Sequence, residues 1–389
     1  MSASAAAGPV LIVEHQAPSP DRDSGSLRLQ RVIDELQALG HPVVFFPMRD
    51  TAGRAYTDRL RRRGVAVLTG RAAQARFLAE QGHLIGTAIL CRPEPALQTL
   101  ALIRDAAPQC VIAYDTVDLH HHRLHRQADL AFAEGAPDRY ALRARAESTR
   151  ALELMLVREC DVTLVVSEDE RRLLEAEVPG ADVDVLSNIH LPPGVNRGPV
   201  DGARILFVGN YLHQPNVDAA LRLCTEILPA VRREVPDAVV DLVGDAAPPE
   251  VAALAGESVT VHGWVPDLGP LYAAARVAVA PLRYGAGVKG KVGEAVEHGV
   301  PVVGTPVAVE GMGLLPERDV LVGGTTAELA AQLVRVLRDD TIGVRLAASA
   351  GPALAARCGP GAARAALTRL VARRRNAPAA AMTLESSLV

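Results

Sequence analysis

The chain alternates short apolar segments with amphipathic helical patterns, and it does so in two separate series. Such alternation is typical of strands joined by crossover helices, which pack into a parallel sheet covered on both faces. Strands are predicted at 10–13, 43–46, 64–68, 86–90, 110–114 and 162–166, and in the second series at 204–208, 238–243, 258–262, 276–281, 301–304 and 319–322. Because 389 residues exceed the size of an ordinary single core, we predict two doubly wound α/β domains.

Residues 189–203 separate the two series, since they are rich in proline and glycine and carry no periodicity. The predicted parts are an N-terminal domain at 1–190, a linker at 191–203, a C-terminal domain at 204–359, a basic helix at 360–376 and a disordered tail at 377–389. Doubly wound sheets bind ligands beyond the carboxyl ends of their strands. The two domains are therefore expected to face one central cleft.

Composition argues against several classes of protein. Aromatic residues make up only 3% of the chain and the net charge is -4, which disfavours nucleic acid as a partner. The five cysteines show no paired spacing, which favours a reducing compartment. No apolar run approaches the roughly 18 residues of a membrane span, and the N-terminus lacks a cationic segment before an apolar one. We expect a cytoplasmic protein without a transmembrane segment.

The only two lysines, Lys289 and Lys291, lie in one glycine-rich stretch at 284–294, although the chain has 41 basic residues. A short helical pattern at 291–298 follows, and the N-terminus of a helix attracts anions. Arg283 adds a third cation, and the glycines let backbone N–H groups approach a ligand closely. These features predict a phosphate site. A solvated surface turn is the alternative.

The same stretch, from Gly285 to Gly290, also matches the GxGxxG pattern of dinucleotide-binding domains. A nicotinamide-dependent dehydrogenase is therefore an alternative, with Glu310 as the acid that would bind the ribose. The pattern falls late in its domain, does not emerge directly from a strand, and places two lysines beside the phosphate. These departures favour another kind of anion site.

Lys291, Glu294 and His298 share one face of the predicted helix by its 3.6-residue period. Glu294 lies one turn inside the helix, where a carboxylate can accept hydrogen bonds from both hydroxyls of a ribose. The alternative is a solvent-facing glutamate that complements the helix dipole.

Several segments resemble glycosyltransferase family 4. They are Ile205-Leu206-Phe207-Val208-Gly209-Asn210, Gly263-Trp264-Val265-Pro266-Asp267 and the stretch from Gly290 to Val303, with Pro18 to Ser26 and Tyr114 to His120 resembling acceptor-domain segments of bacterial members. The resemblance implies the GT-B fold, in which two Rossmann-like domains face a central cleft. It also implies retaining transfer of a sugar from a nucleoside diphosphate sugar to a hydroxylated small molecule or glycan.

The resemblance, together with the phosphate site, assigns roles to residues of both domains. Lys289 and Lys291 would stabilise the charge on the departing diphosphate, and Glu294 would hold the ribose. Gly25 and His120 would close the site from the first domain, with His120 touching the donor sugar or the acceptor. The full donor-binding set is Gly25, Gly209, Asn210, Val265, Arg283, Gly287, Val288, Gly290, Glu294 and Glu310.

This chain departs from the family pattern at two places. The family motif has two glutamates separated by seven residues, and Glu294 fits the second, but Ala286 occupies the first position. The customary arginine and lysine after the first strand of the C-terminal domain are replaced by Asn210-Tyr211-Leu212-His213-Gln214. These departures suggest that Lys289 and Lys291 have taken over the diphosphate.

The histidines His120, His121, His122 and His125 offer a possible metal site. Three consecutive histidines cannot share one helix face, however, and only Asp118 lies at a normal ligand interval. The aspartate pairs at 21 and 23 and at 182 and 184 have the spacing of metal-diphosphate motifs. Since lysines can neutralise the diphosphate, we expect no metal and no cofactor apart from the nucleotide sugar as co-substrate.

Two other functions are compatible with the same donor site. A nucleotide-sugar epimerase of the GT-B fold would change the donor without any acceptor. A non-catalytic partner subunit would bind the nucleotide sugar without releasing nucleotide, and Ala286 in place of a glutamate makes that alternative reasonable.

Overall fold

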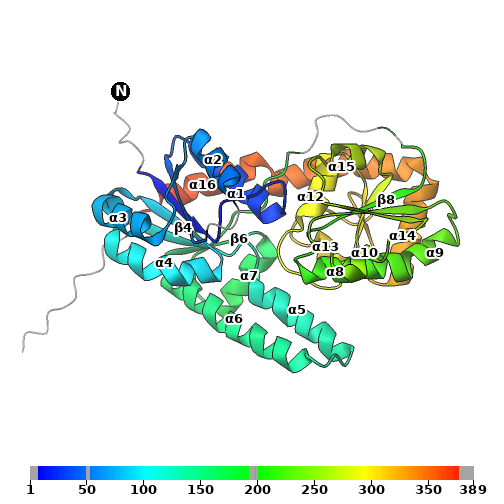
Figure 1. Cartoon of the computed structure of the whole chain (residues 1–389), viewed down its shortest axis with the longest axis horizontal. Coiled ribbons are helices and arrows are strands. Elements are labelled where there is room, and N and C mark those ends of the chain that lie inside the picture. Colours follow the sequence, from blue (N-terminus) through cyan, green and yellow to red (C-terminus); the bar gives the residue numbers. More distant parts are fainter. Residues whose placement is uncertain (1–7, 50–52, 192–197, 199, 376–389) are drawn as a thin grey trace, which may run out of the picture.

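The computed structural model describes residues 8–49, 53–191, 198 and 200–375. Two α/β domains, each built on a parallel sheet, lie next to each other along the long axis of the molecule (Figure 1). The predicted tail at 377–389 lies outside the described residues, as do 192–197 and 199 of the predicted linker. None of the helices in the described part combines the length and the apolar character needed to cross a membrane.

The N-terminal domain has a seven-stranded sheet in the order β3-β2-β1-β4-β5-β6-β7, and all neighbouring strands are parallel. The strands are β1 (Val10–Glu14), β2 (Val43–Pro47), β3 (Ala66–Val67), β4 (Thr87–Cys91), β5 (Val111–Asp115), β6 (Val162–Val165) and β7 (Val183–Val185). The helices are α1 (Ser24–Ala38), α2 (Arg54–Arg62), α3 (Arg71–Gln81), the 3₁₀ turn η1 (Gly82–Leu84), α4 (Pro93–Ala106), α5 (His120–Ala133), α6 (Arg139–Glu159) and α7 (Glu168–Glu177). The strand order reverses between β1 and β4, which opens a crevice at their carboxyl ends.

The C-terminal domain has a six-stranded parallel sheet in the order β10-β9-β8-β11-β12-β13. Its strands are β8 (Arg204–Val208), β9 (Val239–Val243), β10 (Val259–Gly263), β11 (Val277–Ala280), β12 (Val302–Gly304) and β13 (Leu321–Val322). Its helices are α8 (Gln214–Arg222), the π-helical turn η2 (Leu223–Ile227), α9 (Leu228–Arg232), α10 (Pro249–Ala252), α11 (Gly269–Ala274), α12 (Gly290–Glu297), α13 (Pro306–Val309), α14 (Thr326–Arg338) and α15 (Asp340–Cys358). Here the order reverses between β8 and β11.

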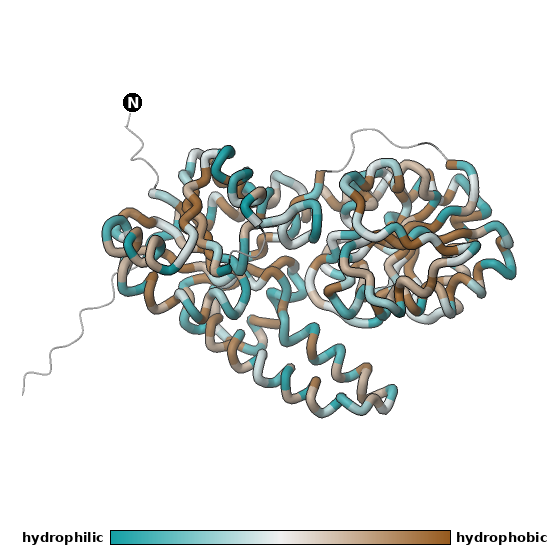
Figure 2. The backbone as a smooth tube through the Cα atoms, viewed as in Figure 1, coloured by the Kyte–Doolittle hydropathy of each residue, from teal (hydrophilic) through white to brown (hydrophobic). Residues whose placement is uncertain are grey.

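Both sheets are buried on their two faces, which explains why their strands are almost continuously apolar. Hydrophobic segments run through the centre of each domain, while polar segments cover the outside (Figure 2). Leu29 and Ile33 of α1 pack on one face of the N-terminal sheet, and Ile103 of α4 packs on the other. The C-terminal domain has one continuous core of mainly valine, leucine and alanine, as the low aromatic content predicts.

The last helix, α16 (Pro360–Ala372), returns from the C-terminal domain to the N-terminal one. Leu367 and Leu370 of this helix lie in the same hydrophobic core as Leu29 of α1. Its arginines pair with acids of the N-terminal domain: Arg364 with Glu35 at 2.9 Å and Arg369 with Asp184 at 2.7 Å. The described chain therefore connects the domains a second time through α15 and α16.

Candidate active site

A cavity of about 480 Å³ lies between the carboxyl ends of the two sheets. The N-terminal wall is formed by residues that follow β1, β4 and β5, and the C-terminal wall by those that follow β8, β9, β10 and β11, together with α12. Both reversals of strand order open into this cavity, which we call the cleft. This is where two facing doubly wound sheets are expected to bind a shared ligand.

Two helices from different domains begin at the same point of the cleft. A Cβ atom placed on Gly290, the first residue of α12, would lie only 2.2 Å from the Cβ of Ser24, the first residue of α1. Glycine at 290 therefore permits an approach that any other residue would prevent. Each helix N-terminus carries partial positive charge and N–H groups outside the helical ladder, so the pair can attract an anion. At α1 the Asp23 carboxylate accepts from one of these groups, the Ser26 N–H, at 2.8 Å.

Lys291 lies in the first turn of α12 and lines the cleft. Its ammonium donates a hydrogen bond to Oδ1 of Asn216 and lies 4.4 Å from the centre of the Phe207 ring. Burial, together with the charge of Lys289, lowers the pKa of Lys291 to about 7. A bound diphosphate would favour the charged form, since an anion stabilises a neighbouring ammonium.

Lys289 precedes α12 and is also in the cleft wall, but acceptors of the protein hold its ammonium. Nζ donates to the Gly287 carbonyl at 2.6 Å and to Oε1 of Glu310 at 2.8 Å. Arg126 of α5 reaches across from the other domain and donates to both oxygens of Glu310, at 2.7 and 3.0 Å. Glu310 therefore neutralises two cations. It is not among the residues that line the cleft, and this position does not support its predicted contact with the donor.

Arg283 also lies away from the lining of the cleft. Its Nε donates to Oδ2 of Asp218 at 2.9 Å, and its guanidinium pairs with Glu134, which follows α5 in the other domain. Since two carboxylates balance its charge, Arg283 links the domains rather than adding a third cation to the phosphate site.

Lys291, Glu294 and His298 all line the cleft, as their predicted common helix face requires. The Tyr272 hydroxyl donates to Oε2 of Glu294 at 3.3 Å, and the Tyr272 ring stacks on His298 with 4.4 Å between ring centres. Burial, together with the nearby charge of Glu297, raises the pKa of Glu294 to about 7. Hydrogen-bond donors of a bound ligand would therefore favour the charged carboxylate of Glu294.

Most of the remaining predicted donor residues line the cleft. These are Gly25, Gly209, Asn210, Val265 and Val288, together with Ala286 at the position where the family has a glutamate. Gly287 lies behind the lining, and a Cβ there would be 2.9 Å from the Cβ of Asp118 in the other domain. Gly287 therefore allows the domains to approach each other instead of facing the ligand.

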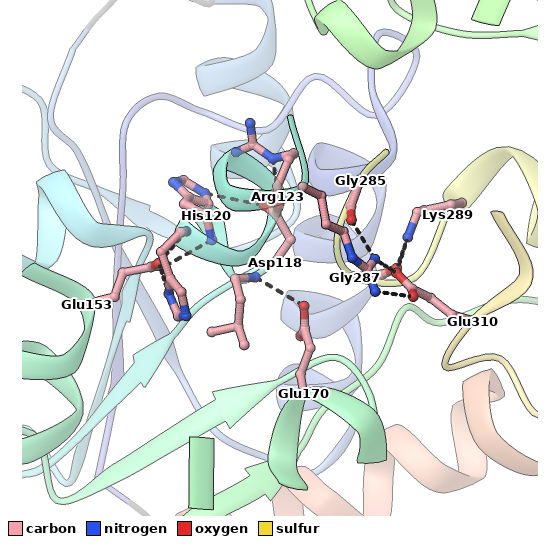
Figure 3. A network of polar contacts seen from close by, with 12 residues as sticks. Asp118, His120, Arg123, Glu153, Glu170, Gly285, Gly287, Lys289 and Glu310 are labelled. Atoms are coloured by element: carbon pink, nitrogen blue, oxygen red, sulfur yellow. Dashed lines mark hydrogen bonds and ion pairs between the residues drawn. The ribbon is translucent and has the colours of Figure 1, made fainter. Parts of the chain in front are cut away.

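His120 lies one layer behind the cleft. Its Nε2 is 3.2 Å from Oδ1 of Asp118, and its backbone N–H donates to Oε1 of Glu153 at 3.1 Å (Figure 3). Asp118 and Arg123 line the cleft, whereas His120 does not. In this arrangement His120 contacts the cleft wall through Asp118.

His121 and His125 point to separate acids. Nδ1 of His121 lies 2.7 Å from Oε2 of Glu153, and Nε2 of His125 lies 2.9 Å from Oε1 of Glu147. Within the described part of the chain, no three His, Cys, Asp or Glu side chains come together in an arrangement that could hold a metal ion. Of the two aspartate pairs, the one at 182 and 184 binds arginines that follow or belong to α16.

One end of the cleft is closed by contacts between the domains. The Arg22 guanidinium lies over the Trp264 ring at 4.4 Å and donates to Oδ2 of Asp245 at 2.6 Å. The indole N–H of Trp264 donates to the Asp21 carbonyl at 2.9 Å. Residues on the loop after β1 therefore cover the loops after β9 and β10.

Several side chains of the cleft wall were not predicted from the sequence, namely those of Arg22, Arg92, Arg123 and His213. Arg92 lies two residues after the strand predicted at 86–90, and a polar residue just past a strand end is a recognisable signal. In a chain with so many arginines, however, a single one after a strand does not stand out. Arg22 faces the cleft through its contacts with Asp245 and Trp264 of the other domain, which a sequence pattern does not show.

Comparisons with known proteins agree with this architecture. Residues 202–339 match the family model described as Glycosyl transferases group 1. A search among curated proteins finds no match. Sucrose-phosphate synthase from Thermosynechococcus elongatus has a similar structure, with a TM-score of 0.67 and 17% identity over 93% of this chain and 98% of that chain.

Two further solved structures resemble the whole molecule. HepE from Anabaena in complex with UDP and glucose gives a TM-score of 0.69 at 15% identity, over 93% of this chain and 98% of that one. The lipopolysaccharide outer core galactosyltransferase WaaB gives 0.61 at 14% identity, over 93% and 99%. The fold is therefore GT-B, and the family match identifies the C-terminal domain as a glycosyltransferase domain. The chain is a glycosyltransferase.

Proposed function

We propose that this enzyme transfers a sugar from a nucleoside diphosphate sugar to a hydroxylated acceptor with retention of configuration, as a cytoplasmic bacterial member of glycosyltransferase family 4. The observation that carries the proposal is the meeting of the N-termini of α1 and α12 at Ser24 and Gly290, beside the ammonium of Lys291. This arrangement suits a diphosphate, whose charge grows as the bond to the sugar breaks. The neighbour HepE was also solved with UDP-glucose, which is a donor of this class.

In the proposed reaction the bond between the anomeric carbon and the diphosphate oxygen breaks, and the acceptor oxygen forms the new bond to that carbon on the same face. The proton of the acceptor hydroxyl passes to the departing diphosphate. Lys291 and the N–H groups at the two helix N-termini would stabilise the departing diphosphate. Glu294 would accept hydrogen bonds from the ribose, and the loop at Trp264 and Val265 would lie along the base. No covalent protein intermediate is part of this proposal.

A nucleotide screen tests the donor assignment. Uridine, guanosine, adenosine and thymidine diphosphates should be compared by thermal unfolding, because a ligand at 100 times its Kd stabilises the folded state by about 2.7 kcal/mol. We expect one of them to raise the Tm more than its monophosphate does. If no nucleoside diphosphate raised the Tm, the donor assignment would be wrong.

Glu294→Gln is expected to weaken nucleoside diphosphate binding by about 1.5–3 kcal/mol, the usual contribution of a hydrogen bond to a charged group. Calorimetry with the ribose and 2′-deoxyribose forms of the same diphosphate separates this role from a general effect. The variant should lose affinity mainly for the ribose form. An equal loss for both forms would show that Glu294 does not contact the 2′-hydroxyl.

Turnover is expected to survive an excess of EDTA, because Lys291 and two helix N-termini take the place of a divalent cation at the diphosphate. Nucleotide release should be measured before and after chelation, with Mg²⁺ added back. Complete loss of activity that Mg²⁺ restores would instead indicate that a metal ion binds the diphosphate.

Donor incubated alone distinguishes the remaining alternatives. An epimerase would convert the donor sugar without an acceptor, whereas the proposed transferase leaves it unchanged apart from slow hydrolysis. A non-catalytic subunit would bind the donor but release no nucleotide with any acceptor.

A further inference from the structure

A second group of cations faces the donor site from the N-terminal wall of the cleft. Arg92 directly follows β4, and Glu14 ends β1, which pairs with β4 at the reversal of strand order. Arg123 lies in the first turn of α5. Both arginines line the cleft, at the position where a doubly wound sheet binds ligands.

Each of these arginines is held through its Nε atom. Nε of Arg92 donates to Oε2 of Glu14 at 3.2 Å, and Nε of Arg123 donates to Oδ2 of Asp118 at 2.8 Å. No hydrogen bond from Nη1 or Nη2 of either arginine reaches another described residue. Each guanidinium is thus oriented by a carboxylate while its two terminal nitrogens remain available, which is the geometry that binds two oxygens of a phosphate or carboxylate.

The other two arginines of the cleft wall differ in this respect. Arg22 uses a terminal nitrogen on Asp245, and Arg28 uses both on Asp115. Lys289 is likewise paired with Glu310. Arg92 and Arg123 are therefore the cleft arginines whose terminal nitrogens are free to bind a ligand.

The backbone around these arginines is strained. Arg92 has a φ of 69° and Val117, which follows β5, has a φ of 63°, although neither is a glycine. Both residues line the cleft, and strained residues of this kind cluster at ligand sites.

His213, at the start of α8 on the opposite wall, has a pKa lowered by burial and by the charge of Arg123, so it adds a neutral hydrogen-bonding group nearby.

We propose that Arg92 and Arg123 bind a phosphate or carboxylate group of the acceptor, so that the acceptor is an anionic hydroxylated compound. This inference rests on the proposed function, which assigns the donor diphosphate to Lys291 and the N-termini of α1 and α12. The two arginines belong to the wall opposite Lys291 and Glu294. An acceptor held there by its anionic group would present its hydroxyl to the donor sugar between the two walls.

The test is a calorimetric titration of inorganic phosphate into the full-length protein, first without nucleotide and then saturated with the nucleoside diphosphate that the thermal screen selects. We expect phosphate to bind in both cases. Arg92→Gln and Arg123→Gln should each weaken phosphate binding by about tenfold or more, in line with loss of a charged hydrogen bond, and leave nucleotide affinity within about twofold. Arg92→Lys keeps the positive charge but has no pair of terminal nitrogens, so it should lose less phosphate affinity than Arg92→Gln.

Arg49→Gln is the matched control, because Arg49 is an exposed arginine paired with Glu94 outside the cleft. It should change neither affinity. Failure of phosphate to bind the nucleotide-saturated protein, or arginine variants that weaken the nucleotide as much as the phosphate, would assign these residues to the donor diphosphate and overturn the proposal. Absence of phosphate binding to the wild type would overturn it as well. If no nucleotide bound but phosphate still bound in a way that depends on Arg92, the proposed donor site would be wrong while the arginine site would stand.

Discussion

Replacing Asp115 by alanine is expected to lower the free energy of unfolding by about 3–5 kcal/mol, because it leaves a buried cation without its partner. Arg28 donates to Oδ2 of Asp115 at 2.7 Å and to Oδ1 at 3.0 Å, and both side chains are only 1% exposed. Arg28 also donates to the Leu186 carbonyl at 2.7 Å. This ion pair therefore joins α1, β5 and the segment that leaves the N-terminal domain.

Chemical denaturation followed by circular dichroism measures this effect. The double variant Arg28→Met with Asp115→Leu should recover most of the loss, since apolar residues of similar volume can replace a buried ion pair. Glu80→Ala removes the acid of an exposed pair with Arg76 and should cost no more than about 1 kcal/mol. If Asp115→Ala matched Glu80→Ala, the burial of the Arg28 pair would be contradicted.

The order of strands and helices could be predicted because its signals are local. Each predicted strand position holds a strand, although the one predicted at 64–68 contains only Ala66–Val67. The helical segment that follows β8 runs through α8, η2 and α9, and its middle turn is π-helical. The return of α16 could not be predicted, because the surface that receives it is formed by α1 more than 300 residues earlier in the chain.

In the candidate site, too, only the features with a local sequence signal could be predicted. The cleft-facing side of α12 could be predicted from its 3.6-residue period alone. The positions of Arg283 and Glu310 could not, because their partners Glu134 and Arg126 come from the far side of the cleft. A sequence pattern shows that a charge is present, but an ion pair between domains decides whether a ligand can use it.

The use of lysine at 291 has a physical explanation in its surroundings. An arginine stays charged at any ordinary pH, whereas a lysine can lose its proton when buried. Lys291 is buried against Phe207 and close to a second lysine, so its uncharged form is accessible near neutral pH. The site can therefore be neutral when empty and charged when a diphosphate is bound.

Nucleoside diphosphate affinity is therefore expected to be greatest near pH 7 and to fall on both sides. Above about pH 7 the empty site has a neutral Lys291, and a bound anion must restore its proton. The Kd should then rise up to about tenfold per pH unit. Below about pH 7 Glu294 is protonated and cannot accept both ribose hydrogen bonds, so the affinity falls again. The diphosphate itself takes up a proton near pH 6, which further lowers the affinity at acidic pH.

Variants separate the two sides of this profile. Lys291→Met should weaken binding at pH 7 by about 1.5–3 kcal/mol and abolish the loss of affinity at alkaline pH. Lys291→Arg keeps a fixed charge, so its affinity should stay level above pH 7. In Glu294→Gln, the loss of affinity below pH 7 should shrink to the part that protonation of the diphosphate causes. Calorimetry from pH 5.5 to 9 measures all three, and an alkaline loss that persists in Lys291→Met would show that another group titrates there. A flat profile for the wild type would mean that neither Lys291 nor Glu294 changes its charge when the donor binds.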